Sequence, residues 1–153
     1  MEYRSYRKSD KIRVIEIFYS NCPKYFRKND LAELDYFLEN FADENYLVAV
    51  KNNSVIGAGG HYTKSNYHGI VWVMFERGSL GSKNLLQVAK DFYNEIENRI
   101  LAEKRHFDIQ INTTQIMESL FKSFGFTTYN KKEDGFGKGL DEYKMINSKL
   151  RLK

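Results

Sequence analysis

The stretch with the clearest potential for chemistry runs from Arg77 to Lys83 and reads Arg-Gly-Ser-Leu-Gly-Ser-Lys. It is short and polar, and it stands directly before a segment with helical periodicity. The first backbone N–H groups of a helix have no partner within the helix and lie at the positive end of its dipole. Such a loop can bind an anion, and glycines let the anion approach because they carry no Cβ. A tight connection without a ligand is an equally good interpretation of this loop taken alone.

Two better-known phosphate motifs are excluded in this loop. Gly78 and Gly81 are its only glycines. The sequence therefore contains neither the Gly-x-x-x-x-Gly-Lys-Ser/Thr nucleotide loop nor the Gly-x-Gly-x-x-Gly dinucleotide fingerprint here.

The elements on either side of the loop would position it. Ile70 to Phe75 is an unbroken apolar run, typical of a strand buried on both faces. After the loop, apolar residues recur at helical spacing and predict a long helix that ends near Glu103. These residues are Leu85, Ala89, Phe92, Tyr93, Ile96 and Ile100.

The rest of the chain predicts the element order β-α-α-β-β-β-α-β-α-β-β. Period-two and buried runs place the other strands at 3–7, 46–51, 54–63, 107–111, 126–129 and 142–146. Helical stripes with polar caps place the other helices at 12–22, 31–41 and between Thr114 and Gly125. Asn52-Asn53 is expected to form a two-residue hairpin turn, and the glycine-bearing segment Lys131–Leu140 is expected to be a loop.

Composition limits the function classes. The chain has 153 residues and is expected to form one domain over 1–153, with 146–153 as a frayed basic tail. Charges of both signs are interspersed and sum to +4. A nucleic-acid-binding surface would need basic residues clustered on one face, so a nucleic-acid partner is not expected. The lone Cys22, the absence of any Cys/His zinc spacing and the lack of a long apolar run predict a cytoplasmic protein without metal, disulfide or membrane span.

With this element order, three segments resemble the GNAT superfamily of acyl-CoA-dependent N-acetyltransferases. Arg77–Ser82 followed by Lys83-Asn84-Leu85-Leu86 is similar to that family's Arg/Gln-x-x-Gly-x-Gly/Ala signature, with Gly81 in the role of the final glycine in a loop that is shorter by at least one residue. Thr114–Phe126 resembles its segment that commonly ends Tyr-Glu-Lys-x-Gly-Phe, and Phe121 replaces the tyrosine. Asp134–Asp141 before Tyr143 resembles a loop of one bacterial subgroup.

The resemblance implies an α/β (α+β) fold with a central mixed, mostly antiparallel sheet of six to seven strands flanked by about four helices. It also implies acetyl-CoA as cosubstrate. The loop would bind the pyrophosphate, the strand edge before it the pantetheine, and a backbone N–H near Met74 the oxyanion. The implied cofactor-binding residues are Val73, Met74, Phe75, Arg77, Gly78, Ser79, Leu80, Gly81, Ser82, Lys83, Asn112, Thr114 and Phe121.

No catalytic side chain is assigned from the sequence. The reaction implied is direct attack of a neutral amine on the thioester, with His68 as one candidate base and a solvated turn histidine as the alternative. Glu76 is expected to turn away from the loop because a carboxylate would repel the cofactor. Tyr62, Tyr67 or Tyr143 could border the acceptor pocket, while Trp72 is expected in the core. Asn112 and Thr114 could instead only cap the next helix.

The acceptor stays open, as a small-molecule or peptide amine, and a homodimer is expected by family analogy alone. Two other classes are kept as alternatives. One is an acyl-CoA-binding module without turnover, which the missing tyrosine at Phe121 permits. The other is an RNA- or ribosome-associated protein, suggested by the pI near 9.0.

Overall fold

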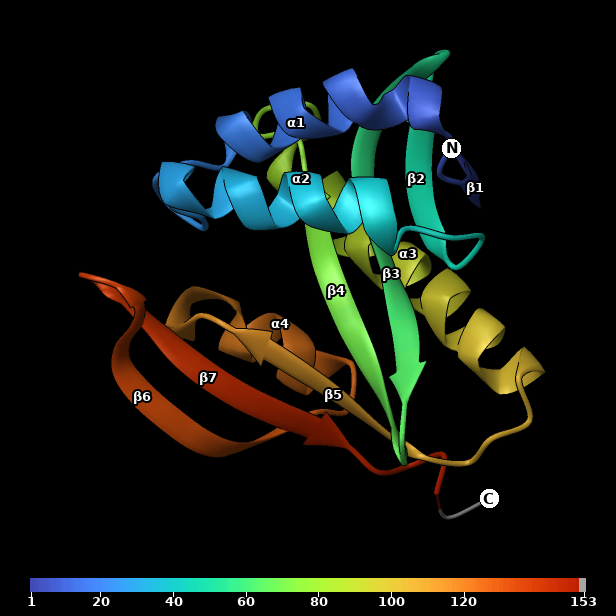
Figure 1. The fold of residues 1–153 in the computed structure, drawn as a ribbon, viewed down its shortest axis with the longest axis vertical. Coiled ribbons are helices and arrows are strands. Elements are labelled where there is room, and N and C mark those ends of the chain that lie inside the picture. Colours follow the sequence, from blue (N-terminus) through green and yellow to red (C-terminus); the bar gives the residue numbers. More distant parts are fainter. Residues whose placement is uncertain (152–153) are drawn as a thin grey trace. The chain divides into compact units, whose positions relative to one another are not determined.

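The computed structural model describes residues 1–151, and its elements follow the predicted order (Figure 1). The strands are β1 (Glu2–Ser5), β2 (Tyr46–Lys51), β3 (Ser54–Lys64), β4 (Tyr67–Phe75), β5 (Asp108–Thr113), β6 (Thr127–Gly137) and β7 (Leu140–Asn147). The α-helices are α1 (Lys11–Ser20), α2 (Leu31–Asn40), α3 (Ser82–Ala102) and α4 (Glu118–Ser123), and short 3-10 turns precede α1, α2 and α4.

The strands form one hydrogen-bonded sheet of seven in the order β1-β2-β3-β4-β5-β7-β6. β1 pairs with β2, β2 with β3, β5 with β7 and β6 with β7 in antiparallel fashion, whereas β4 pairs with β5 in parallel. The predicted mixed, mostly antiparallel sheet with four α-helices is therefore confirmed. Among the described residues, no helix combines the length and the apolar character needed to cross a bilayer.

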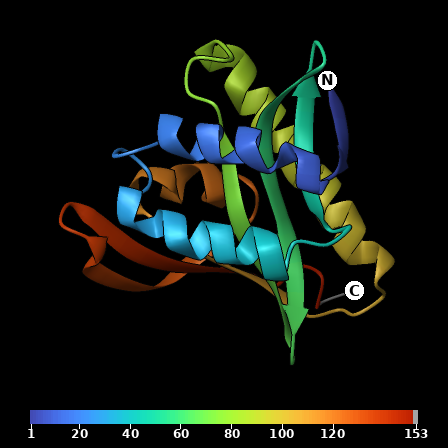
Figure 2. The ribbon, with the colours of Figure 1, turned by 45° about the horizontal axis from the view of Figure 1, so that its top comes forward.

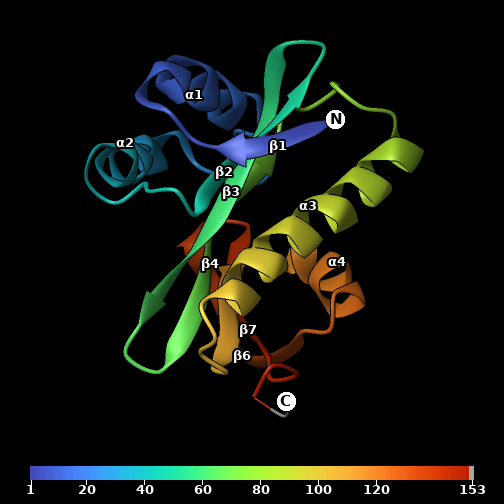
Figure 3. The same ribbon diagram turned by 90° about the vertical axis from the view of Figure 1, so that its right-hand side faces the viewer.

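The chain divides into two compact units, and β3 and β4 run from one into the other. The first unit comprises Met1–Gly60 and Trp72–Glu97, and the second comprises His61–Val71 and Asn98–Lys153, described as far as residue 151. In the first unit, α1 and α2 run side by side over one face of the strands (Figure 2). α3 covers the opposite face (Figure 3).

The core of the first unit follows from the apolar stripes of its helices. Val14, Ile17 and Phe18 of α1 have no exposed surface, and Leu34 and Leu38 of α2 are likewise buried. On the other face, the ring of Phe92 from α3 packs against the rings of Tyr3 and Phe75 at centroid distances of 5.5 and 5.4 Å. In the second unit the buried apolar residues are Ile70, Ile100, Ile109, Ile111, Phe121, Phe126, Leu140, Met145 and Leu150.

Two local predictions are confirmed by the backbone. Asn52 and Asn53 both have positive φ, 50° and 64°, as a type I′ hairpin turn requires. Gly125 ends α4 with φ of 103°, and the next amide donates to the carbonyl of Phe121 at 3.1 Å. This pattern is a Schellman ending, which a glycine supports at no steric cost.

Several boundaries differ from the prediction by a few residues, and the largest difference is in one segment. Lys131–Leu140 is not a loop, because β6 continues to Gly137 and turns directly into β7. The register shift between Lys132 and Gly137 takes up the extra residues, and Gly137 and Gly139 adopt positive φ at the turn. The first helix ends before Cys22, at Ser20.

The predicted tail also starts too early. β7 runs to Asn147, and the side chain of Leu150 is only 2% exposed. The span 146–150 is therefore not frayed, since Asn147 and Leu150 are buried although Lys149 is exposed; Leu152 and Lys153 lie outside the described residues.

Candidate functional site

The loop between β4 and α3 is open on its outer side. Gly78 has φ of +82°, and a Cβ built on Gly78 or Gly81 would meet no atom within 4 Å. The amide of Leu85 donates to the carbonyl of Gly81 at 2.8 Å, which is the first helical bond of α3. The preceding N–H groups, at the start of a helix that begins at Ser82, lack intrahelical acceptors. They form a donor set at the positive end of a long helix.

The start of this loop is held by α1. The side-chain amide of Asn21 donates to the carbonyl of Phe75 at 2.8 Å, and the backbone N–H of Arg77 lies 3.2 Å from Ser20 Oγ. Asn21 is only 4% exposed, so its amide is a fixed, buried donor. These bonds set the direction in which the chain leaves β4.

Glu76 is neutralised by an ion pair on the side of α1. Its carboxylate lies 2.7 Å from the guanidinium of Arg13, which also donates to the carbonyl of Val55 at 2.8 Å. This ion pair is consistent with the expected structural role of Glu76. The exposed cations Arg77 and Lys83 therefore dominate the charge at the loop.

The strand that leads into the loop carries a break at Trp72. Its φ is +47°, a left-handed conformation that is uncommon for a bulky side chain and that resembles the geometry of a β-bulge. The hydroxyl of Tyr46 donates to the carbonyl of Trp72 at 3.0 Å, and the indole packs against the rings of Phe18 and Phe26. Burial raises the pKa of Tyr46, which keeps this hydroxyl protonated as a donor.

The same strand pairs only briefly with β5. The β4–β5 ladder joins three residue pairs, from Tyr67 with Asp108 to Gly69 with Gln110. Val73, Met74 and Phe75 lie beyond this ladder, so their backbone edge is not taken up by it. An extended edge of this kind can accept the amides of a ligand as an added strand would.

The second unit contains the other predicted cofactor residues. Asn112 is exposed and lies within β5 opposite Lys144 of β7, so the alternative that it only caps a helix is wrong. Thr114 does occupy the cap position of the turn before α4, but its side chain makes no capping hydrogen bond. Its hydroxyl is buried and has no hydrogen-bond partner among the described residues, so it is available to a ligand or a water molecule.

Phe121 lies in the core of the second unit. It is 4% exposed, and its ring packs edge-on against Phe124 and Phe126 at centroid distances of 5.8 and 5.6 Å. No hydroxyl is present there to donate a proton. A general acid at this position would have to be a water molecule.

The candidate base His68 is not a solvated turn residue. Its side chain has no exposed surface, Nδ1 faces Thr63 Oγ1 at 2.8 Å, and Nε2 lies 2.8 Å from the carbonyl of Arg105. Tyr62 is 42% exposed and packs against Tyr67, and burial raises the pKa of Tyr62 to about 12. The tyrosine is therefore protonated at neutral pH and cannot act as a base there.

In sequence, neither a protein-family model nor a curated protein matches the chain significantly. In structure, many solved proteins match over nearly all of it. A ribosomal-protein-alanine N-acetyltransferase from Brucella melitensis superposes with a TM-score of 0.73 at 16% identity over 96% of this chain and 99% of its own. A GNAT superfamily phosphinothricin acetyltransferase from Sinorhizobium meliloti, solved with acetyl-CoA, gives 0.70 at 15% identity over 95% and 86%.

A chain of the NatC complex, solved with Gag peptide and CoA, gives a TM-score of 0.74 at 16% identity over 95% of this chain and 96% of its own. The chain has the GNAT fold. The fold expected from the sequence is therefore confirmed, and it accounts for the order of the elements around the loop.

Several residues that shape the loop and its strand were not identified from the sequence. Neither the left-handed conformation of Trp72 nor its bond from Tyr46 was predicted, because tryptophan has no preference for positive φ. Asn21 and Arg13 were also missed as anchors of the loop. Arg13 lies on the first helix and Asn21 directly follows it, and nothing else in the sequence marks either residue.

Proposed function

We propose that the protein is an acetyl-CoA-dependent N-acyltransferase that moves an acetyl group to an amine. One observation carries the proposal. A strand edge that lies beyond its parallel partner ends in an open glycine loop, and this loop leads into the N-terminus of a long helix. This arrangement offers donors for a pyrophosphate and backbone groups for pantetheine within one continuous segment.

In this proposal, backbone N–H groups of Gly78 to Lys83 bind the pyrophosphate, and Arg77 and Lys83 add positive charge. The edge at Val73–Phe75 pairs with the pantetheine amides, and the N–H near Met74 stabilises the oxyanion of the tetrahedral intermediate. The solved proteins with this fold include acetyltransferases bound to acetyl-CoA or CoA, which supports the choice of cosubstrate.

The reaction would be a direct displacement. The nitrogen lone pair of a neutral amine attacks the thioester carbonyl, the C–S bond breaks as the tetrahedral intermediate collapses, and CoA leaves as the thiolate. The amine loses one proton to solvent or base, and the thiolate gains one from water, since Phe121 offers none. The acceptors named in the solved relatives include a protein alanine and phosphinothricin, so peptide and small-molecule amines are both candidates here.

The test is acetyl transfer to a panel of amines, measured as CoA thiol released from acetyl-CoA. Peptide N-termini, lysine peptides, polyamines and aminoglycosides form the panel. Gly81→Asp places a carboxylate in the open loop and is expected to abolish transfer. The matched control is Asn94→Asp, which adds the same charge at an exposed position in the middle of α3 and is expected to retain it.

Three outcomes separate the candidates. Thiol release that depends on an amine and is lost only in Gly81→Asp supports the enzyme. Tight acetyl-CoA binding without release on any amine favours the binding module instead. Absence of both acetyl-CoA binding and transfer in the folded protein contradicts the proposal.

A further inference from the structure

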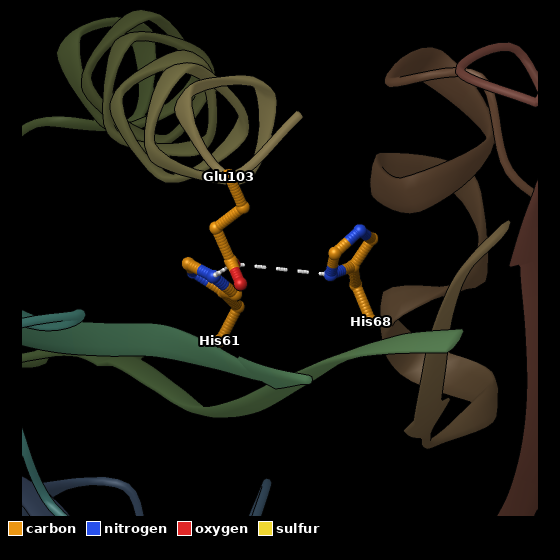
Figure 4. A group of neighbouring side chains, drawn as sticks. All are labelled: His61, His68 and Glu103. Carbon is orange, nitrogen blue, oxygen red and sulfur yellow. Dashed lines mark hydrogen bonds and ion pairs between the residues drawn. The ribbon is translucent and has the colours of Figure 1, made fainter. Parts of the chain in front are cut away.

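Three side chains that could ligate a metal ion meet inside the second unit. They are His61 on β3, His68 on β4 and Glu103, which directly follows α3 (Figure 4). One ligand atom from each residue lies within 4.8 Å of the others. Both histidine side chains have no exposed surface, and the side chain of Glu103 is 18% exposed. The imidazoles are thus fixed, and the carboxylate is open to solvent on one side.

His68 is held in the neutral tautomer that leaves Nδ1 able to bind a metal ion. Its Nε2 lies 2.8 Å from the backbone carbonyl of Arg105, and a carbonyl can only accept, so Nε2 carries the proton. Nδ1 therefore keeps its lone pair, and it points toward Glu103 at 3.9 Å. A second ring N–H bonded to a carbonyl is the usual support of a ligating histidine.

A hydrogen-bond network connects the acceptor atoms of the cluster. The hydroxyl of Thr63 lies 3.0 and 3.1 Å from the two carboxylate oxygens of Glu103 and 2.8 Å from Nδ1 of His68, but it has one proton for these three acceptors. His61 contacts the same carboxylate through Nε2, and Arg105, which is half exposed, contacts its other oxygen. Each acceptor of the cluster therefore has a donor within reach, and a metal ion would have to displace these contacts.

We propose that His61 Nε2, His68 Nδ1 and the carboxylate of Glu103 form a binding site for a zinc ion. Two imidazoles and one carboxylate are a known zinc ligand set, with a water molecule in the fourth position. At metal–ligand distances of about 2.1 Å, tetrahedral ligand atoms lie roughly 3.4 Å apart, so the widest pair of the cluster, which lies within 4.8 Å, must close by up to about 1.4 Å, and the contact between His61 and the carboxylate must lengthen. Glu103 lies beyond the end of α3 and can move away from His61, while the side chains of His61 on β3 and His68 on β4 must approach each other.

Binding requires two local changes. The proton that His61 directs to the carboxylate moves to Nδ1, so that Nε2 can coordinate. The guanidinium of Arg105 leaves the carboxylate for solvent. The ion would then connect β3, β4 and the residue after α3. Sequence spacing gave no sign of this site, and no metal was expected, because its ligands come from three separate elements. The proposal does not depend on the proposed acyltransferase function.

The test is zinc binding by the purified full chain after treatment with a chelator, measured by competition with a chromogenic chelator. We expect one zinc ion per chain with micromolar or tighter affinity, and no binding of Mg²⁺, which prefers oxygen ligands. His68→Gln and Glu103→Gln should each weaken binding at least tenfold. His106→Gln is the matched control, because His106 is exposed and not part of the cluster, and it should bind as the wild type does.

A second measurement uses the wild-type protein alone, so it tests the site even if a variant fails to fold. Cobalt substituted into the wild-type protein should give the strong visible absorption of a four-coordinate site, and zinc should displace it. The proposal is overturned if the folded wild type binds no zinc below 100-fold excess over protein. It is also overturned if Glu103→Gln binds zinc unchanged or if His106→Gln loses it, since the three groups would then form only a buried hydrogen-bond network.

Discussion

The hydrogen bond from the hydroxyl of Tyr46 to the carbonyl of Trp72 leads to the most detailed testable prediction. Tyr46→Phe keeps the aromatic ring, which packs edge-on against Tyr6 and Phe37, and removes only the hydroxyl that lies 3.0 Å from the Trp72 carbonyl. Tyr46 is 1% exposed, so no water replaces the donor directly. The carbonyl of Trp72 then loses the hydrogen bond from β2 that helps to hold this residue in its left-handed conformation.

The size of the effect follows from the hydrogen bond alone. A lost neutral bond that leaves a partly buried acceptor without its donor costs about 1–2 kcal/mol. For a chain of this length, that corresponds to a fall in melting temperature of roughly 2–8 °C. Because the Trp72 break sets the direction of Val73–Phe75, we also expect acetyl-CoA to bind roughly two- to tenfold more weakly, a change of about 1 kcal/mol.

The fluorescence of Trp72 can report both the loss of stability and the weaker binding of acetyl-CoA. Trp72 is the single tryptophan of the chain, so its fluorescence reports urea unfolding and ligand binding at the break itself. Tyr36→Phe on α2 is the control, because Tyr36 is 61% exposed and its change should stay within about 0.5 kcal/mol. A Tyr46→Phe protein as stable as the control, with unchanged acetyl-CoA affinity, would refute the reasoning.

Further predictions concern charge and packing in the first unit. The hydrogen bond from Arg4 lowers the pKa of Asp10, so this pair stabilises the fold above about pH 4 and the contribution is lost as the pH falls through the folded-state value. The difference in unfolding free energy between wild type and Asp10→Asn, measured in urea, should thus be largest at pH 7 and should narrow progressively as the pH falls below about 4; a difference that does not change with pH would contradict this prediction. Arg13→Gln removes the partner of Glu76 and should weaken acetyl-CoA binding about two- to fivefold at low salt, an effect that 0.5 M salt should abolish. Gly60→Ala places a Cβ against the backbone of the segment entering β2 and should cost about 1–3 kcal/mol, so an unchanged urea midpoint would show that this contact relaxes freely.

The sequence was sufficient for features that depend on local chemistry. The apolar stripes predicted the helices, the Asn52-Asn53 pair predicted a turn with positive φ, and Gly125 predicted a helix end. Each depends on the preferences of a few adjacent residues. The open loop at Gly78 and Gly81 belongs to this group, since it is defined by a strand, two glycines and a helix in immediate succession.

Features set by distant contacts could not be predicted. Trp72 takes a left-handed conformation because Tyr46, Phe18 and Phe26 hold it there, and no residue near it in sequence signals this. The Lys131–Leu140 segment reads as a loop because it is rich in glycine and charge, yet pairing with β7 makes most of it a strand. In both places, contacts with residues elsewhere in the chain override the local sequence preference.

The measurement that tests the central claim most directly is calorimetric titration of acetyl-CoA into the purified protein, beside Gly81→Asp and Asn94→Asp. We predict one site per chain with micromolar affinity in the wild type and in Asn94→Asp, and its loss in a folded Gly81→Asp protein. Equal affinity in all three proteins, or no binding to the folded wild type, would contradict the role of the loop as the pyrophosphate site.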